Sequence, residues 1–434
     1  MNLSTIKSSI QKHSYFPKYS GLVFLVLFVI ISFIYNYQHI LFKPPQSLHQ
    51  WRQCDCLSIT YNYYQDHNAF LEPAMHNLGE DGTGKSVSDC PLIYFLVAKL
   101  WQIFGHHEYL YRLFVLILFF TGLYALFKIF ERTFRDSVIS MILTLYLFTS
   151  PTLVYYANNF LMDIPALSLA LIGLYYFFRF EQSESDKHLY LSAIFYTLAG
   201  LLKISSLLTF FAIMGLFILE LLKIKLYSDR KLFKYPIKQA SVFLGVILVQ
   251  IAWYLYAHHY NSNHNSGNFL IGILPVWNMS PELISATFNA IIEHVKWDYF
   301  RLETQVFFIL IFISILLYYK NVNKLILIFT LTAAAGFLAY LVLFFEPLKD
   351  HDYYTINLFI MVPIVLFAFL SLLKNRFSSI YTSLVFRIIL VAFLIHNIDF
   401  ARRRISDRYN PDKWQNKYYS THLKSFEEIN PYLK

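Results

Sequence analysis

The feature that most constrains this chain is a succession of long apolar stretches separated by short loops. A membrane-spanning helix needs about 20 predominantly apolar residues, and somewhat fewer where neighbouring helices cover it. The stretches of this kind lie near residues 20–42, 108–130, 136–151, 163–180, 188–202, 204–222, 238–258, 303–319, 324–345, 354–373 and 379–397. The sequence therefore predicts an all-α polytopic membrane protein with about 11 transmembrane helices.

The composition supports a membrane protein and excludes two other classes. Of the 434 residues, 57% are hydrophobic and 15% are charged, and the mean hydropathy is +0.45, which is too apolar for a soluble domain of this length. The 43 Phe and 34 Tyr fit aromatic belts at two membrane interfaces. The net charge of +9 comes mostly from Lys and Arg between apolar stretches, so membrane lipids are the expected surroundings and no nucleic acid partner is expected.

Basic residues predict the orientation, because short loops rich in Lys and Arg stay in the cytoplasm. With a cytoplasmic N-terminus, the following residues all fall on the cytoplasmic side: Lys128, Arg132, Arg135, Arg179, Lys187, Lys223, Lys225, Arg230, Lys231, Lys234, Lys320, Lys324, Lys374 and Arg376. Two long loops, 43–107 and 259–302, then face outward, and chemistry is expected there. We expect one transmembrane domain over residues 1–400 and a polar C-terminal tail at 401–434. With eleven spans the tail is external, and it becomes internal if one weak span is miscounted.

The first long loop predicts two helices that lie on the membrane surface. Over His49–Asp66, helical spacing places Arg52 and Asp55 on one polar quarter of the circumference, beside a more apolar arc. The stretch Pro91–Gly105 is apolar but too short to span a bilayer, and it contains Lys99. Both segments are therefore expected to be interfacial helices.

The three cysteines of the chain, Cys54, Cys56 and Cys90, all belong to this loop. A disulfide from Cys54 or Cys56 to Cys90 would close the loop on an oxidising side of the membrane, and the odd number leaves at least one thiol unpaired. A Cys-x-Cys metal site is the alternative, but the sequence offers it no clear His partner.

Several short motifs together resemble one known superfamily. WRQCD and DCPLIY in the first loop resemble the first external loop of the GT-C glycosyltransferases, most closely the bacterial family that includes aminoarabinose transferases and protein O-mannosyltransferases. Tyr155–Leu167 (YYANNFLMDIPAL), Ala199–Leu207 (AGLLKISSL) and His351–Pro363 (HDYYTINLFIMVP) are similar to later outer-face motifs of that family. The resemblance implies a GT-C-like fold with interfacial helices in the first loop. It also implies an enzyme that transfers a sugar from a polyprenyl-phosphate donor to a lipid, glycan or protein acceptor.

The resemblance implies that Asp55 is the catalytic general base of an inverting displacement. A carboxylate would take a proton from the acceptor while the polyprenyl phosphate leaves from the opposite face of the sugar. Arg52, three residues earlier, would favour the ionised carboxylate. The family usually has Glu after this Asp, whereas this chain has Cys56, so the use of a divalent metal cation stays open.

Asp163 is the second catalytic candidate, because the resemblance implies that it positions an acceptor or a metal. The alternative is that it caps a helix, with Pro165 in the tolerated first turn. Asp89, just before Pro91, is the candidate metal ligand. Its alternative role is also that of a helix cap.

The leaving group of such a reaction is a phosphate, so cations and hydrogen-bond donors should surround it. The candidate phosphate-binding residues are Arg52, Lys203, His351, Tyr353 and Tyr354. Each has a simpler explanation. Lys203 could extend to the interface from a short hairpin, the tyrosines could belong to an aromatic belt, and His351 could form a solvated cluster with its neighbouring Asp residues.

A transporter or lipid flippase is the competing prediction, and a non-catalytic assembly or polymerase subunit is a third. Transporters place ionisable residues near the membrane midplane, often in two similar halves, whereas the polar motifs here gather at one face. No Walker motif is present, because Gly82–Lys85 lacks the required length. Four further histidines are expected to lie in loops: His258, His259, His264 and His294. The resemblance predicts the bacterial inner membrane, with the active site on the extracytoplasmic face.

Overall fold

The computed structural model describes residues 14–227, 230–269, 272–413 and 416. Within these ranges the regular structure is helical, and β-structure is limited to two isolated bridges. The first half contains α2 (Pro17–Ile34), α3 (Tyr37–Ile40), α4 (Gln50–Gln65), α5 (Leu92–Phe104), α6 (Glu108–Phe134), α7 (Ser137–Leu145), α8 (Pro151–Ala157), α9 (Asp163–Ser183), α10 (Asp186–Leu202) and α11 (Leu208–Leu221). The second half contains α12 (Pro236–Asn263), α13 (Pro281–His294), α14 (Leu302–Leu317), α15 (Lys324–Leu343), α16 (Met361–Arg376), α17 (Ser378–Tyr381) and α18 (Leu384–Arg408). The prediction of an all-α protein is confirmed.

The number of spans differs from the prediction. Among the described residues, eight helices are long and apolar enough to cross a membrane, or nine if the α13–α14 pair, bent by 106°, counts as one. Two of the predicted segments fall outside this set. Residues 188–202 form α10, which has 17 residues, and residues 136–151 are divided between the nine-residue α7 and a 3-10 turn. The count of eleven is therefore not confirmed, whereas a multi-pass membrane protein is.

The α7–α8 segment is a broken path through the middle of the molecule. Its helix is interrupted near Phe148, whose ψ of 25° is not helical, and it resumes with Pro151 in the first turn of α8. The described side chains of residues 137–157 lie inside the protein, with small exposures only near the start of the segment. It follows α18 from that helix's first turns to its last. Non-helical backbone is tolerated at membrane depth when protein covers it, which is the case here.

One buried ion pair fixes the start of this path. Arg387 of α18 is 6% exposed and donates from Nη1 to Oδ1 of Asp136 over 3.1 Å, while Asp136 also caps α7 through the amide of Ile139. Replacing Arg387 with Gln should lower the free energy of unfolding in mixed micelles by about 3 kcal/mol, because a buried carboxylate loses its partner. The exposed Arg376→Gln is the control, and an equal loss there would contradict the prediction.

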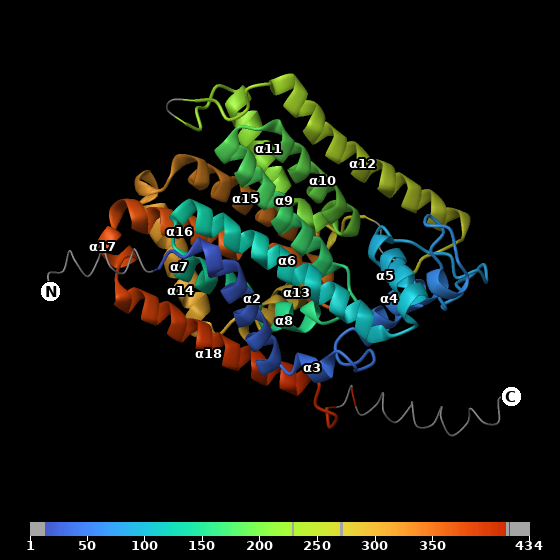
Figure 1. Cartoon of the computed structure of the whole chain (residues 1–434). Helices are drawn as coiled ribbons and strands as arrows, with labels where there is room; N and C mark the ends of the chain where they lie inside the picture. The colour runs from blue at the N-terminus through green and yellow to red at the C-terminus, as the bar shows by residue number, and fades with distance from the viewer. Residues whose placement is uncertain (1–13, 228–229, 270–271, 414–415, 417–434) are drawn as a thin grey trace.

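Helix α9 forms the centre of the bundle and packs between α6 and α10 (Figure 1). The backbones of α6 and α9 approach so closely that a Cβ on Gly122 would lie 2.7 Å from the Cα of Ser168. Small residues at such crossings allow the close packing on which helix association in lipid depends. The central position of α9 brings its first residue, Asp163, into the interior at the end of the bundle where α4 and α5 lie.

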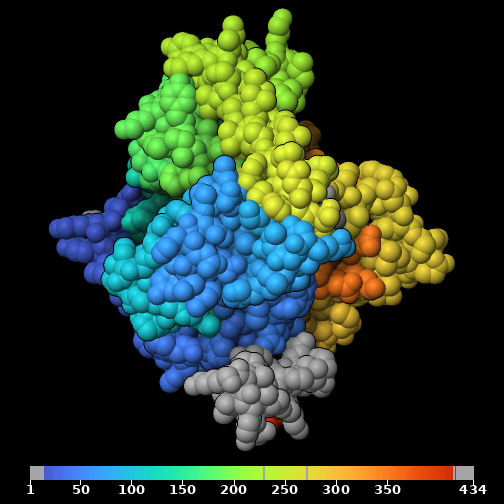
Figure 2. All heavy atoms as spheres, turned by 90° about the vertical axis from the view of Figure 1, so that its right-hand side faces the viewer, coloured from blue at the N-terminus to red at the C-terminus, as the bar shows by residue number. Residues whose placement is uncertain are grey.

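That end, called the loop end from here on, carries both predicted interfacial helices (Figure 1). They are α4 and α5, and α5 is too short to span a membrane. Figure 2 views this end, with the first loop in blue beside the second loop in yellow. Two expectations change. His258 and His259 lie within α12 and His294 ends α13, so these three histidines are helical rather than in loops, and α18 continues beyond residue 401 to Arg408, so it covers the first residues of the predicted tail. Residues 414–415 and 417–434 of the tail lie outside the described residues.

Candidate active site

Three charged side chains from distant parts of the chain meet at the loop end. Arg52 of α4 donates to Oδ2 of Asp89 over 3.0 Å, and Nζ of Lys203 lies 3.2 Å from Oδ1 of the same carboxylate. The exposed fraction of the side chain is 8% for Arg52, 8% for Asp89 and 15% for Lys203. Burying charges is costly unless they are paired, so this arrangement indicates a site rather than a solvated surface.

Asp163 lies beside these three residues. It is 2% exposed and is the first residue of α9, directly after the N-cap residue Met162, and its carboxylate interacts with its own backbone amide, so a helix-end role and a place in the cluster are compatible. Although burial alone lowers the pKa of Lys203, the carboxylates of Asp89 and Asp163 hold this pKa well above its ordinary value. Lys203 therefore stays positively charged, with two carboxylates around it.

Two tyrosines complete what we call the Lys203 cluster: Arg52, Asp89, Asp163, Lys203, Tyr353 and Tyr354. Nζ of Lys203 lies 6.0 Å from the ring centroid of Tyr353 and 5.5 Å from that of Tyr354. The His351 ring packs in a tilted arrangement against both tyrosine rings, and burial lowers its pKa, so it is a neutral ring at pH 7. Its Nδ1 is buried and has no hydrogen-bond partner. The predicted phosphate-binding residues thus meet, and simple interfacial positions do not explain them.

A cavity of about 640 Å³ extends from this cluster into the bundle. Its polar end is lined by Ser88, Asp89, Lys203, Ser205 and Tyr354. Its apolar part lies between α11, α12 and α15 and is lined by Leu207, Phe211, Ile247, Ile251, Leu255, Ile273 and Phe344. Phe211, Ile251 and Leu255 are also exposed on the outside of the bundle, so the cavity opens on a surface that faces lipid. A charged end joined to an apolar channel fits an amphiphile.

Asp55 does not join the Lys203 cluster. It is half-buried, it does not line the cavity, and within the described residues its carboxylate has neither a hydrogen-bond partner nor an ion pair. Partial burial raises the pKa of Asp55, while the charge of Arg52 acts in the opposite direction. The structure therefore places it one helical turn from Arg52 as a free carboxylate able to accept a proton, whereas Asp89 is held by two cations.

The cysteines are all free thiols, so the structure does not contain the disulfide considered above. Burial raises the pKa of Cys56 and of Cys90 to about 11, although Arg52 acts against this at Cys56. We expect maleimide to label Cys54, which is exposed, and to leave the other two unlabelled until the protein is denatured. Mass spectrometry of tryptic peptides measures this. Rapid labelling of Cys90 in the folded protein would contradict the prediction.

The candidate metal site does not fit a divalent cation. Arg52 and Lys203 occupy both oxygens of Asp89, so the group around this carboxylate is cationic. Within the described residues, no group of three or more His, Cys, Asp or Glu side chains could hold a metal ion. Hard cations need several oxygen ligands, which this cluster does not provide.

Sequence reasoning missed several polar residues that line the cavity or support its lining. Asn357 donates to Oγ of Ser205, a lining residue, over 3.0 Å, and the side-chain carbonyl oxygen of Asn357 is buried without a partner in the described part of the chain. Gln250 and His258 line the cavity from α12. A Gln and an Asn inside apolar stretches are uncommon at membrane depth, and this signal could have found Gln250 and Asn357.

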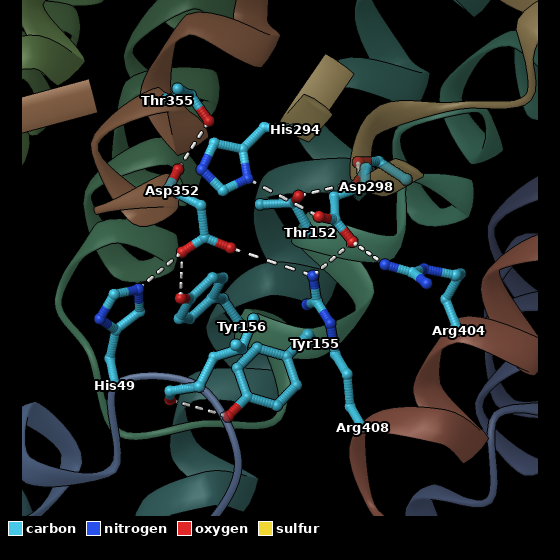
Figure 3. Close-up of polar contacts among 12 residues, drawn as sticks. His49, Thr152, Tyr155, Tyr156, His294, Asp298, Asp352, Thr355, Arg404 and Arg408 are labelled. Carbon is cyan, nitrogen blue, oxygen red and sulfur yellow. Dashed lines mark hydrogen bonds and ion pairs between the residues drawn. The ribbon is translucent and has the colours of Figure 1, made fainter. Parts of the chain in front are cut away.

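A second group of charges lies beside the first and is buried almost as deeply (Figure 3). We call it the Asp352 network: His49, Tyr156, His294, Asp298, Asp352, Arg404 and Arg408. Asp352 is 2% exposed. Its Oδ1 accepts a hydrogen bond from the Tyr156 hydroxyl over 2.5 Å and lies 3.1 Å from Nε2 of His49. This network is not predicted from the sequence, because its members come from five separate segments and its two arginines fall in the predicted tail.

Comparisons with known proteins agree with this architecture. Residues 88–264 match the family model of dolichyl-phosphate-mannose-protein mannosyltransferases. No curated protein sequence gives a significant match. The crystal structure of ArnT from Cupriavidus metallidurans bound to undecaprenyl phosphate has a TM-score of 0.51 at 11% identity, over 88% of this chain and 75% of that chain. The oligosaccharyltransferase of Archaeoglobus fulgidus has a TM-score of 0.47 at 12% identity, over 94% of this chain and 60% of that chain. Residues 88–264 are therefore similar to the mannosyltransferase family, and the chain as a whole shares the fold of ArnT.

Proposed function

We propose that this protein transfers a sugar from a polyprenyl-phosphate donor to an acceptor at the loop end. The observation that supports this most strongly is the Lys203 cluster at the polar end of a cavity that opens to lipid. A polyprenyl phosphate likewise has an anionic head group joined to a long apolar tail. In this proposal the tail enters between α11, α12 and α15, and the phosphate lies against Lys203. ArnT, which shares the fold, was crystallised with undecaprenyl phosphate.

In the proposed reaction, Lys203 and Arg52 stabilise the charge that develops on the departing phosphate. Preorganised charges in a site that excludes water act more strongly than they would in water. Tyr353 and Tyr354 line the same position and can donate hydroxyl hydrogen bonds. Asp55 lies outside the cavity, so it can approach the sugar from the side opposite the leaving group, as an inverting displacement requires.

The orientation and membrane are part of the proposal. The basic residues of the predicted cytoplasmic loops include Arg230 and Lys234, which pair with Glu184 at the turn between α9 and α10, away from the loop end. The positive-inside rule then puts the loop end on the extracytoplasmic face. We propose the bacterial inner membrane as the location, from the bacterial members that the motifs resemble.

The function is tested with purified protein in detergent and a panel of polyprenyl-phosphate sugars, with free polyprenyl phosphate as the readout. We expect release that requires both protein and acceptor, and that continues in EDTA, because the Asp89 carboxylate already has two cationic partners. Release that stops in EDTA and returns with Mg²⁺ or Mn²⁺ would overturn the metal-independent form of the proposal.

The transporter or flippase is tested in the same material after reconstitution into liposomes. A flippase moves the intact donor between leaflets and breaks no bond, so it would show translocation without release. The polar residues of the Lys203 cluster gather around Arg52 of the first-loop helix α4, at one end of the bundle rather than at its midplane, which favours the transferase.

A further inference from the structure

The Lys203 cluster depends on two segments that are far apart in the sequence. Helix α4 supplies Arg52, and the segment Asp352–Ile360 supplies Tyr353 and Tyr354. Helix α4 belongs to the first loop, whereas Asp352–Ile360 is a nine-residue 3-10 helix at the start of the apolar run Asp352–Arg376. Something must therefore fix the distance between them.

The first contacts that do so are those of Asp352. Its Oδ1 meets Nε2 of His49, the residue directly before α4, which takes a left-handed conformation with φ 49°. The His49 ring then packs edge-on against Tyr353, with the centroids 5.0 Å apart. Asp352 thus joins the start of α4 to the turn that carries both tyrosines.

Arg408, at the end of α18, forms a long ion pair with Asp352, whose Oδ2 has no hydrogen-bond partner among the described residues. Its Nη2 lies 3.9 Å from Oδ2 of Asp352 and donates to Oδ1 of Asp298 over 2.8 Å. Arg404 donates to the same Asp298 oxygen over 2.9 Å. The two arginines therefore balance the charges of Asp298 and Asp352, as Figure 3 shows.

Arg408 also reaches the chain that leads into α4. Its guanidinium lies over the ring of Tyr155, 4.8 Å from the centroid. The Tyr155 hydroxyl donates to the carbonyl of Gln46 at 2.9 Å or of Leu48 at 3.0 Å, immediately before His49. The Arg408 side chain therefore contacts Tyr155, which supports the chain before α4, and pairs with Asp352, which begins the turn that carries both tyrosines.

We propose that Asp352 and Arg408 are positioning residues that set α4 against the tyrosine turn, so that Arg52, Tyr353 and Tyr354 meet one donor phosphate. The proposal rests on the proposed function for the identity of that phosphate. Burying charged groups is costly before they pair, and a packed apolar contact would be as stable as the buried pairs. A charge network instead fixes one arrangement, because its hydrogen bonds are directional.

The test uses a charge-balanced double variant, Asp352→Asn with Arg408→Gln, beside each single variant. The single variants leave an unpaired buried charge and can fail to fold, whereas the double variant removes one charge of each sign. We expect the double variant to recover most of the thermal stability of the natural protein. We also expect its kcat/KM for the donor to stay about 10²-fold low, mostly through KM, because displaced groups no longer meet the phosphate. Arg402→Gln, an exposed arginine on the same helix, is the matched control.

A structural readout separates this inference from the proposed function. Spin labels on Cys54 of α4 and on an introduced Asp350→Cys, which is exposed beside the tyrosine turn, report the distance between the two segments. We expect a narrow distance distribution in the labelled parent and a broad one in the double variant. A stable double variant with an unchanged distribution or a normal donor KM would overturn the inference. If the natural protein releases no polyprenyl phosphate from any donor, the proposed function fails while the distance measurement still decides the positioning role.

Discussion

Replacing Asp55 with Asn should lower acceptor-dependent turnover by about 10²–10⁴-fold, the range that a positioned general base contributes. The substitution keeps the shape of the side chain and removes only its ability to take a proton. Asp55 has no ion pair within the described residues, so its loss should not unfold α4. Initial rates of polyprenyl phosphate release, with unchanged thermal stability, measure the effect.

The pH dependence gives the same prediction a second readout. Partial burial holds the pKa of Asp55 above its ordinary value, despite the opposing charge of Arg52. The base must be ionised to act, so the rate should fall as the pH drops through this pKa, at a pH above the ordinary value of about 3.9 for Asp. The residual rate of Asp55→Asn should no longer show this fall at low pH, which we call the acid limb of the pH profile.

Two variants make the assignment of the base decisive. Asp66→Asn, at the exposed end of α4, should leave the rate unchanged. Asp89→Asn should weaken donor binding, because Arg52 and Lys203 lose the carboxylate that orients them. A normal rate in Asp55→Asn, together with loss of the acid limb in Asp89→Asn, would assign the base to Asp89 instead.

Short motifs were enough to predict most of the Lys203 cluster. Each motif lies within a few consecutive residues, and the family resemblance indicated which motifs act together. Arg52, Asp163, Lys203 and Tyr353 come from four different stretches, and no helical spacing relates them. Their common location became evident only from the fold. The resemblance also assigns Asp55 to the same reaction as this cluster. In the structure, however, Asp55 lies one helical turn from Arg52 and does not join the cluster.

The Asp352 network could not be predicted, for a physical reason. His49 and Asp352 are 303 positions apart, so no sequence period relates them. Arg404 and Arg408 follow the last apolar stretch, where a run of arginines is typical of a solvated end. Only the continuation of α18 to Arg408 brings them against Asp298.

The number of spans was uncertain for a related reason. Hydropathy measures how apolar a stretch is, but not whether its helix is continuous. Residues 136–151 have the composition of a span, yet they form a short helix and a turn inside the protein. Because neighbouring helices cover this segment, it needs neither the length nor the regular backbone that lipid would impose.

Replacing Lys203 with Gln should lower the rate of donor cleavage by about 10²–10³-fold, because one preorganised charge is removed from the departing phosphate. The ion pair with Asp89 is also lost, and Asp163 is left buried with one cation fewer nearby. Part of the effect could therefore be lost stability rather than lost catalysis.

A double variant separates these two effects of the Lys203 substitution. Lys203→Gln with Asp163→Asn removes one buried charge of each sign, so it should be more stable than the single variant while remaining as slow or slower. Lys99→Gln, an exposed lysine on α5, is the matched control and should behave like the natural protein. Thermal unfolding measures the stability of the variants, and single-turnover release of polyprenyl phosphate measures their rate of donor cleavage. A double variant that regains the natural rate would show that Lys203 only balances Asp163, and the phosphate would then have to be stabilised by Arg52 and the tyrosines alone.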